Sequence, residues 1–143
     1  YQIYTFNNQV NPLIPGTDSQ WLEVADKEQL DQAVANLGET EPAEGTNLEN
    51  VFIAIQQFNP LPDNIYLITD GLPTLGSGAP NRGTISGRER ERLFERTLRE
   101  LPPGIPVNVI MFPLEGDPMA AAEYWKLAVA TGGSYLSPSR DWP

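Results

Sequence analysis

The 143-residue sequence predicts one α/β domain with a doubly wound, mostly parallel sheet and helices on both faces. Two observations lead to this prediction. Segments with strand character alternate along the chain with segments whose apolar residues recur at helical spacing. Residues 65–69 form an apolar run without alternation, which is typical of a strand buried on both faces of a parallel sheet.

The first part of the chain predicts two strands and a helix. Residues 1–6 are mostly β-branched and aromatic and contain no breaker, which favours a strand. After a loop that contains several prolines, residues 21–25 predict a second short strand. Asp26 and Gln29 have the spacing of a helix cap, and Gly38 marks the end of the helix that they begin.

The middle of the chain predicts a helix followed by the most buried strand. Thr46 and Glu49 have the spacing of a capping box. The helix presents one apolar face, formed by Leu48, Val51, Phe52 and Ile55. The strand over 65–69 follows and stops at Asp70. Because ligands bind beyond the carboxyl ends of the strands in a doubly wound sheet, Asp70 stands where a binding residue is expected.

The last part of the chain predicts two more strand and helix units. A long loop over 72–87 leads to Ser86 and Glu89, a second capping box that begins a strongly charged helix. The remaining predicted elements are a strand over 107–112, a helix capped by Asp117-Pro118 and stopped by Gly132-Gly133, and a short strand over 134–136.

The composition excludes several classes of function. Nineteen acidic residues against nine basic ones give a formal net charge of −10, which opposes binding to nucleic acid or to an anionic membrane surface. This charge suits a cation or a basic partner, although acidity also serves solubility alone. The absence of cysteine and histidine excludes disulfides, the usual zinc sites and Ser-His or Cys-His catalytic pairs. We therefore expect a binding protein and not an enzyme.

Thr46 and Asp70 are the candidate metal ligands. Their hydroxyl and carboxylate groups are oxygen donors of the kind that Mg²⁺ and Ca²⁺ take. Each residue also has a purely structural interpretation, with Thr46 as a helix cap and Asp70 as the start of a turn.

Two segments resemble the second and third motifs of the metal-ion-dependent adhesion site in von Willebrand factor A (vWA) domains. They are Gly-Thr-Asn-Leu at 45–48, which opens a helix, and Ile-Tyr-Leu-Ile-Thr-Asp-Gly at 65–71, which ends the buried strand. The later elements that also look like this family are the loop 71–74, the strand 107–112 and the segment 127–133. The resemblance thus covers nearly the whole chain.

The resemblance implies a metal site in which Thr46 offers its hydroxyl and Asp70 binds directly or through water. The metal would be Mg²⁺ or Ca²⁺, with Mn²⁺ as a third candidate, and an acidic side chain of a partner protein would fill an open coordination position. The chain would then be an adhesion or protein-interaction module of a larger cell-envelope or surface protein, without direct insertion into a membrane.

One motif of the family is missing. The Asp-x-Ser-x-Ser segment, which ends the family's first strand and supplies its main metal oxygens, does not occur here. Residues 1–143 are therefore expected to be a single vWA-like domain that is incomplete at its N-terminus, with weak or absent metal binding. The missing strand would lie between 1–6 and 65–69. We expect those two strands to pair directly, or a further segment or a second copy of the chain to complete the sheet.

Two other functions stay open. The missing motif also fits a metal-free vWA-like scaffold. An aspartate at a strand end can be the nucleophile of a phosphoryl-transfer enzyme, but the sequence has no glycine-rich phosphate loop with lysine and no histidine acid, so we disfavour this function.

Overall fold

The computed structural model of the chain describes residues 1–41, 45–77, 85–112 and 115–138. In chain order the elements are β1 (Tyr4–Phe6), β2 (Val10–Pro12), α1 (Lys27–Gly38), α2 (Leu48–Ile55), β3 (Ile65–Thr69), α3 (Gly87–Thr97), β4 (Val107–Met111), α4 (Ala120–Thr131) and β5 (Tyr135–Leu136). In these described parts of the chain, no helix has both the length and the apolar character needed to cross a membrane.

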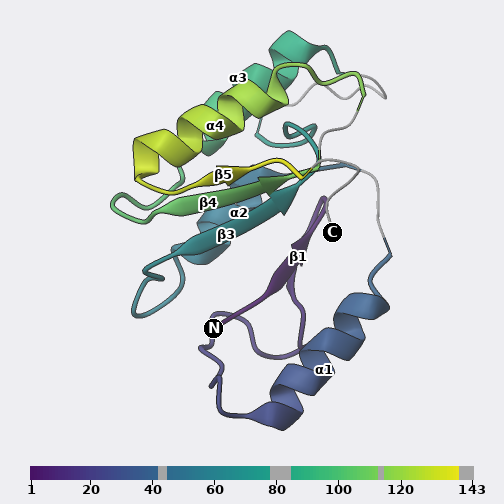
Figure 1. Cartoon of the computed structure of the whole chain (residues 1–143), viewed down its shortest axis with the longest axis vertical. Helices are drawn as coiled ribbons and strands as arrows, with labels where there is room; N and C mark the ends of the chain where they lie inside the picture. The colour runs from purple at the N-terminus through teal and green to yellow at the C-terminus, as the bar shows by residue number, and fades with distance from the viewer. Residues whose placement is uncertain (42–44, 78–84, 113–114, 139–143) are drawn as a thin grey trace.

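The strands form two separate sheets. β3, β4 and β5 make a parallel sheet with β4 in the centre, in which Ile65 lies opposite Val107 and Val109 lies opposite Tyr135. β1 and β2 pair as an antiparallel hairpin, which Figure 1 shows apart from the parallel sheet. Because helices connect the parallel strands, the predicted α/β class is confirmed at this level.

The main core lies between the parallel sheet and the helices α2, α3 and α4. The sheet contributes Leu67 from β3 and Val109 from β4, and the helices contribute Phe52, Phe94 and Tyr124, one from each. The rings of Phe94 and Tyr124 meet edge to face with their centroids 5.0 Å apart, a favourable arrangement for an aromatic pair. All three helices thus pack against the same face of the sheet.

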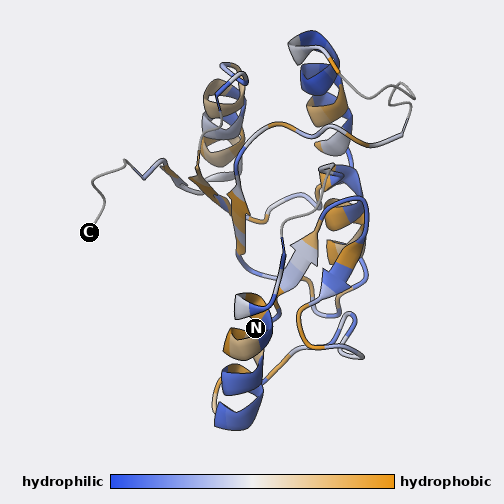
Figure 2. Ribbon diagram, turned by 90° about the vertical axis from the view of Figure 1, so that its right-hand side faces the viewer, coloured by the Kyte–Doolittle hydropathy of each residue, from blue (hydrophilic) through white to orange (hydrophobic). Residues whose placement is uncertain are grey.

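The opposite face of the parallel sheet is uncovered among the described residues. Tyr66 and Ile68 on β3 are 72% and 60% exposed, and Ile68 lies beside Ile110, which lies beside Leu136. Figure 2 shows the strands of this sheet in the orange of hydrophobic residues. The prediction that 65–69 is buried on both faces is wrong for the described chain, because an apolar run does not show which layers fold over it.

Helix α1 does not supply the predicted second helical layer. It lies away from the parallel sheet, at the other end of the molecule (Figure 1). Its Ala33 packs in a second, smaller core with Leu13, Ile14 and Leu22, whereas Val34 on the same helix is 65% exposed. The described chain therefore has helices on one face of its parallel sheet and not on both.

Residues 21–25 form no strand, so that prediction is wrong. Leu22 instead exchanges two backbone hydrogen bonds of 2.9 Å with Tyr1, and the strand that pairs with β1 is β2, which the sequence placed in a loop. The hairpin turn is closed by Asn7, whose Oδ1 accepts a hydrogen bond of 2.7 Å from the Gln9 N–H. This turn depends on an asparagine side chain, which the apolar and β-branched patterns used to predict strands do not take into account.

The signals at several helix ends are confirmed. The Asp26 side chain accepts a hydrogen bond from the backbone N–H of Gln29, and Ser86 forms both bonds of its capping box. Gly132 ends α4 in the left-handed conformation, with φ of +75°. Part of the predicted loop over 72–87, residues 78–84, lies outside the described residues.

Candidate functional site

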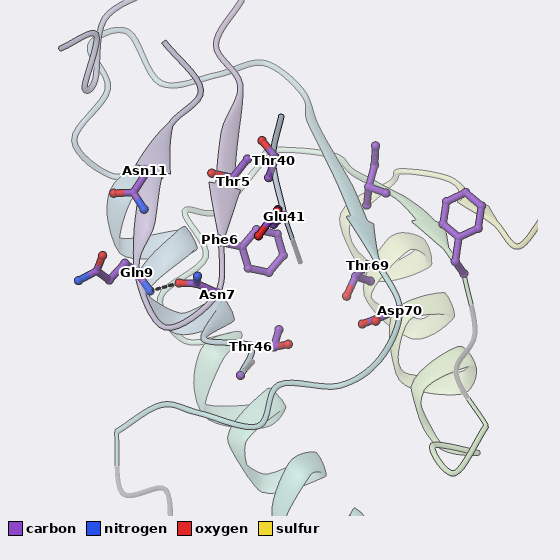
Figure 3. A pocket seen from close by; sticks show the side chains of 13 residues that line it. Thr5, Phe6, Asn7, Gln9, Asn11, Thr40, Glu41, Thr46, Thr69 and Asp70 are labelled. Carbon is purple, nitrogen blue, oxygen red and sulfur yellow. Dashed lines mark hydrogen bonds between the residues drawn. The ribbon is translucent and has the colours of Figure 1, made fainter. Parts of the chain in front are cut away.

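A pocket opens between the hairpin and the carboxyl end of β3. Its volume is about 470 Å³, and Figure 3 shows it from close by. The hairpin forms one wall, the end of β3 and the residue after β4 form the other, and segments before α2 close it. The lining residues are Thr5, Phe6, Asn7, Gln9, Asn11, Thr40, Glu41, Gly45, Thr46, Ile68, Thr69, Asp70 and Phe112.

The two candidate ligands, Thr46 and Asp70, line this same pocket. In Figure 3 their side chains point toward one another, Thr46 from the segment before α2 and Asp70 from the end of β3. Asp70 is exposed, and within the described residues its carboxylate makes no hydrogen bond or ion pair. The sequence placed both residues at one edge of the sheet, and the structure brings them to one pocket.

The charge of the pocket has one sign. Among the lining residues, Asp70 and Glu41 are the charged ones, and both are acidic. The other polar groups that line the described pocket are hydroxyls and amides. Its field therefore favours a cation or a basic group over an anion.

The backbone of Thr46 is tied to the loop that follows Asp70. The Thr46 N–H donates to Thr74 Oγ1 at 2.9 Å, and the Thr46 carbonyl accepts hydrogen bonds of 3.0 Å from the N–H groups of Thr74 and Leu75. Gly45 has φ of +86°, and a Cβ at this position would collide with the Leu75 side chain. These contacts hold the backbone of Thr46 beside the loop without using its hydroxyl.

Asn47, and not Thr46, caps α2. Its Oδ1 accepts a hydrogen bond of 3.2 Å from the Asn50 N–H. The predicted Thr46–Glu49 capping box is wrong, because Glu49 instead accepts a hydrogen bond of 2.6 Å from the Ser77 N–H. Asparagine caps helices as well as threonine does, so the sequence left two adjacent candidates and the path of the backbone decided between them.

We expect Asn47→Ala to lower the free energy of unfolding by about 1 kcal/mol, because it removes the side-chain acceptor of the α2 cap. Thr46→Ala is expected to cost less than about 0.5 kcal/mol, since the Thr46 hydroxyl makes no cap bond. Urea denaturation of the two variants measures the difference. A larger loss for Thr46→Ala than for Asn47→Ala would contradict this cap assignment.

The turn after β3 is held by an ion pair between the buried Asp117 and the partly buried Arg90. Asp117 Oδ2 accepts a hydrogen bond of 2.7 Å from the Leu72 N–H and lies 3.0 Å from Arg90 Nη2. Arg90 in turn donates from Nε and Nη2 to the Leu72 carbonyl, at 3.2 and 2.6 Å. Both backbone polar groups of Leu72 are thus bonded to this pair.

Two buried hydroxyl groups bond Gly71, the residue before Leu72. The Gly71 carbonyl accepts hydrogen bonds from the hydroxyls of Tyr124, at 3.0 Å, and Thr69, at 3.2 Å. Burial raises the pKa of Tyr124 well above its usual range, so its hydroxyl stays protonated and remains a donor. A Cβ on Gly71 would lie 2.9 Å from both Arg90 Nη2 and Asp117 Oδ2, which explains the glycine.

The sequence interpretation missed the roles of Asp117 and Arg90. Asp117 was predicted to cap the helix after it, but α4 begins at Ala120 with Met119 as its N-cap and no side-chain cap bond. For Arg90 the sequence did contain an indication of a buried role. It stands three, four and seven residues before Leu93, Phe94 and Thr97, the buried residues of α3, so it is an arginine on the inner face of the helix.

The described residues offer few metal ligands. They contain no group of three or more Asp, Glu, His or Cys side chains placed to hold a metal ion. At the pocket the oxygen donors are the Thr46 hydroxyl and the Asp70 carboxylate, with Glu41 on the same lining. Because Mg²⁺ and Ca²⁺ take about six or more oxygens, this donor set fits only a mostly hydrated cation.

Comparisons with protein-family models, with curated proteins and with solved structures find no match to this chain. The residues of the pocket and the motifs at 45–48 and 65–71 are therefore the indications of its function.

Proposed function

We propose that this chain is a protein-interaction module of the vWA type and that the pocket around Thr46 and Asp70 is its contact point. One observation carries the proposal. An aspartate before a turn normally bonds the backbone of its own turn. Here Arg90, Asp117 and Tyr124 bond that backbone instead, and the Asp70 carboxylate faces Thr46 across the pocket. Asp70 is thus left to bind an outside group.

In this proposal a divalent cation, Mg²⁺ or Ca²⁺ with Mn²⁺ as a substitute, binds between the Thr46 hydroxyl and the Asp70 carboxylate. The bound metal supplies the positive charge to which an acidic side chain of a partner protein is attracted. The acidic lining of the pocket favours the cation. Since the described residues supply few oxygens at the pocket, water and the partner complete the coordination.

The pocket also has the position that a strand-completing partner would use. In the described sheets, β1 pairs only with β2 and β3 pairs only with β4, so each has a backbone edge without a strand partner. Residues of both strands line the pocket. Unpaired edges recruit strands, so a further segment or a second copy of the chain can complete the sheet here.

The alternative of a phosphoryl-transfer enzyme gains no support from the pocket. Such enzymes neutralise the transferred phosphoryl group with a metal ion and with lysine or arginine side chains. The charged residues that line the described pocket, Glu41 and Asp70, would instead repel a phosphate.

Calorimetric titration with Mg²⁺, Mn²⁺ and Ca²⁺ tests the proposal. We expect weak binding, with half-saturation at or above about 1 mM, because two protein oxygens leave the ion mostly hydrated. A short peptide with one glutamate should strengthen metal binding, since the peptide and the metal then share one site and each raises the affinity for the other. Asp70→Asn should remove both effects.

Two other outcomes would overturn parts of the proposal. Peptide binding that is equally strong in the presence of a chelator would favour the metal-free scaffold. Tight metal binding by the chain would show that further side chains bind the ion, with Glu41 as the first candidate because it lines the same pocket. Of the other acidic residues in the segment 39–45, which precedes α2, Glu39 is not among the lining residues and Glu44 lies outside the described residues.

A further inference from the structure

We infer that Arg90 and Asp117 are positioning residues, which fix the turn after β3 so that the Asp70 carboxylate stays in the pocket. This inference rests on the proposed function, because it takes Asp70 as the ligand-binding group. It goes further by assigning a role in binding to two residues that do not line the pocket.

The ion pair bonds the backbone of Leu72, two residues after Asp70. Asp117 accepts from the Leu72 N–H at 2.7 Å, and Arg90 donates twice to the Leu72 carbonyl. Because both the N–H and the carbonyl of Leu72 are hydrogen-bonded, the two peptide groups that flank Leu72 cannot rotate freely. The direction in which the chain leaves β3, and with it the direction of the Asp70 side chain, is therefore set by groups outside β3.

The location of the pair also favours positioning over simple stabilisation. The Asp117 side chain is 2% exposed, so its carboxylate is almost fully removed from water, and the Arg90 side chain is 19% exposed and therefore partly buried. A buried ion pair is seldom better for stability than a packed apolar pair. A guanidinium group, however, presents several donors in a fixed plane, which defines the direction of the groups that it bonds.

The same pair explains why the residue after Asp70 is glycine. Any Cβ on Gly71 would lie 2.9 Å from Arg90 Nη2 and from Asp117 Oδ2, so the ion pair packs directly against the backbone. Arg90 comes from α3 and Asp117 from the segment before α4. Two segments that are distant from Asp70 in sequence thus meet at the turn that follows it.

The test uses NMR spectra of the whole chain with Mn²⁺ alone as the probe, because paramagnetic line broadening reports even weak binding at Thr46 and Asp70. The variants are Arg90→Gln, Arg90→Lys and Asp117→Asn. The matched control is Lys126→Gln, which removes the basic partner of the Glu123–Lys126 ion pair of 2.6 Å on α4. Amide hydrogen exchange at Leu72 reports the turn itself, independently of any metal.

We expect Arg90→Gln and Asp117→Asn to need about tenfold more Mn²⁺ for the same broadening at Asp70, as is usual when a group that orients a metal ligand is lost. Arg90→Lys should recover part of the loss, and Lys126→Gln should behave like the unaltered chain. Leu72 exchange should accelerate in the first two variants while the amides of Leu67 and Val109 in the core stay protected. If the ion pair only stabilised the fold, amide exchange in the core would accelerate in these variants as well.

The outcomes separate this inference from the proposed function. If Mn²⁺ broadens no signal at Thr46 or Asp70 in the unaltered chain, the proposed metal site is wrong. The positioning role of Arg90 and Asp117 is then still tested by amide exchange at Leu72 and by the chemical shift of the Asp70 amide in the variants. If folded Arg90→Gln and Asp117→Asn keep the unaltered Mn²⁺ response and the unaltered Leu72 exchange, the inference is wrong. Should Arg90→Gln fail to fold, Arg90→Lys gives the same comparison with the charge retained.

Discussion

Alanine at position 133 is expected to lower the free energy of unfolding by about 3 kcal/mol or more and the Tm by roughly 10 °C. A Cβ on Gly133 would collide with the Val107 carbonyl oxygen and would lie 2.5 Å from its carbon and 2.9 Å from the Val107 nitrogen. These are backbone atoms of a fully buried residue in β4, the central strand of the parallel sheet. The strand cannot retreat without disturbing its pairing with β3 and β5.

Gly87→Ala is the matched control for Gly133→Ala. Gly87 is the first residue of α3, and a Cβ there would have no atom within 4 Å. Alanine should therefore stabilise the chain by about 0.4 to 1 kcal/mol, because it reduces the freedom of the unfolded state. Thermal and urea unfolding give both numbers. If the two variants were equally stable, Gly133 would not pack against the Val107 backbone.

The second large effect concerns the association of the chain. In solution at micromolar concentration we expect the preparation to sediment above the 15.8 kDa of one chain. The reason is that β1 and β3 do not pair with each other in the described sheets, and that Ile68 on the open face of β3 is 60% exposed. Exposed edges and apolar sheet faces both promote association.

Ile68→Lys should shift the chain toward the monomer, because a charge on β3 opposes burial by another strand or sheet. Val129→Lys is the control, since Val129 is 59% exposed and lies on α4, away from the pocket. Intact mass separates a second copy of the chain from a covalently attached further segment. A monomer of 15.8 kDa that is stable to heating would contradict the expected sheet completion and the vWA proposal with it.

The predictions from sequence were most accurate for features whose cause lies within a few residues. The Ser86 capping box, the Asp26 cap and the end of the last helix at Gly132 were all predicted from the sequence, because each depends on neighbours within one helical turn. The strands predicted over 65–69 and 107–112 were also confirmed, the second of them ending at Met111, since a short apolar run between breakers is a local property.

The predictions from sequence were least accurate where the structure depends on which segments pair or pack together. The sequence predicted a strand over 21–25 and a loop over 10–12, and the structure has the reverse, because the Asn7 turn folds β2 back onto β1. The run at 65–69 was predicted to be covered on both faces, yet α1 packs on its own small core instead. Apolar periodicity shows that a face can be buried, but not which other element buries it.

The same distinction between local and long-range causes applies to the candidate site. By itself the sequence determined Thr46 and Asp70 as the oxygen donors to consider, because the type of a residue and its place at the end of an element are local facts. Only the tertiary structure decided that Asp117 bonds Leu72, 45 positions away, and that Arg90 joins them while Asn47 takes over the cap. A buried carboxylate needs a donor and a counter-charge wherever the fold provides them, and that choice depends on distances that no local pattern contains.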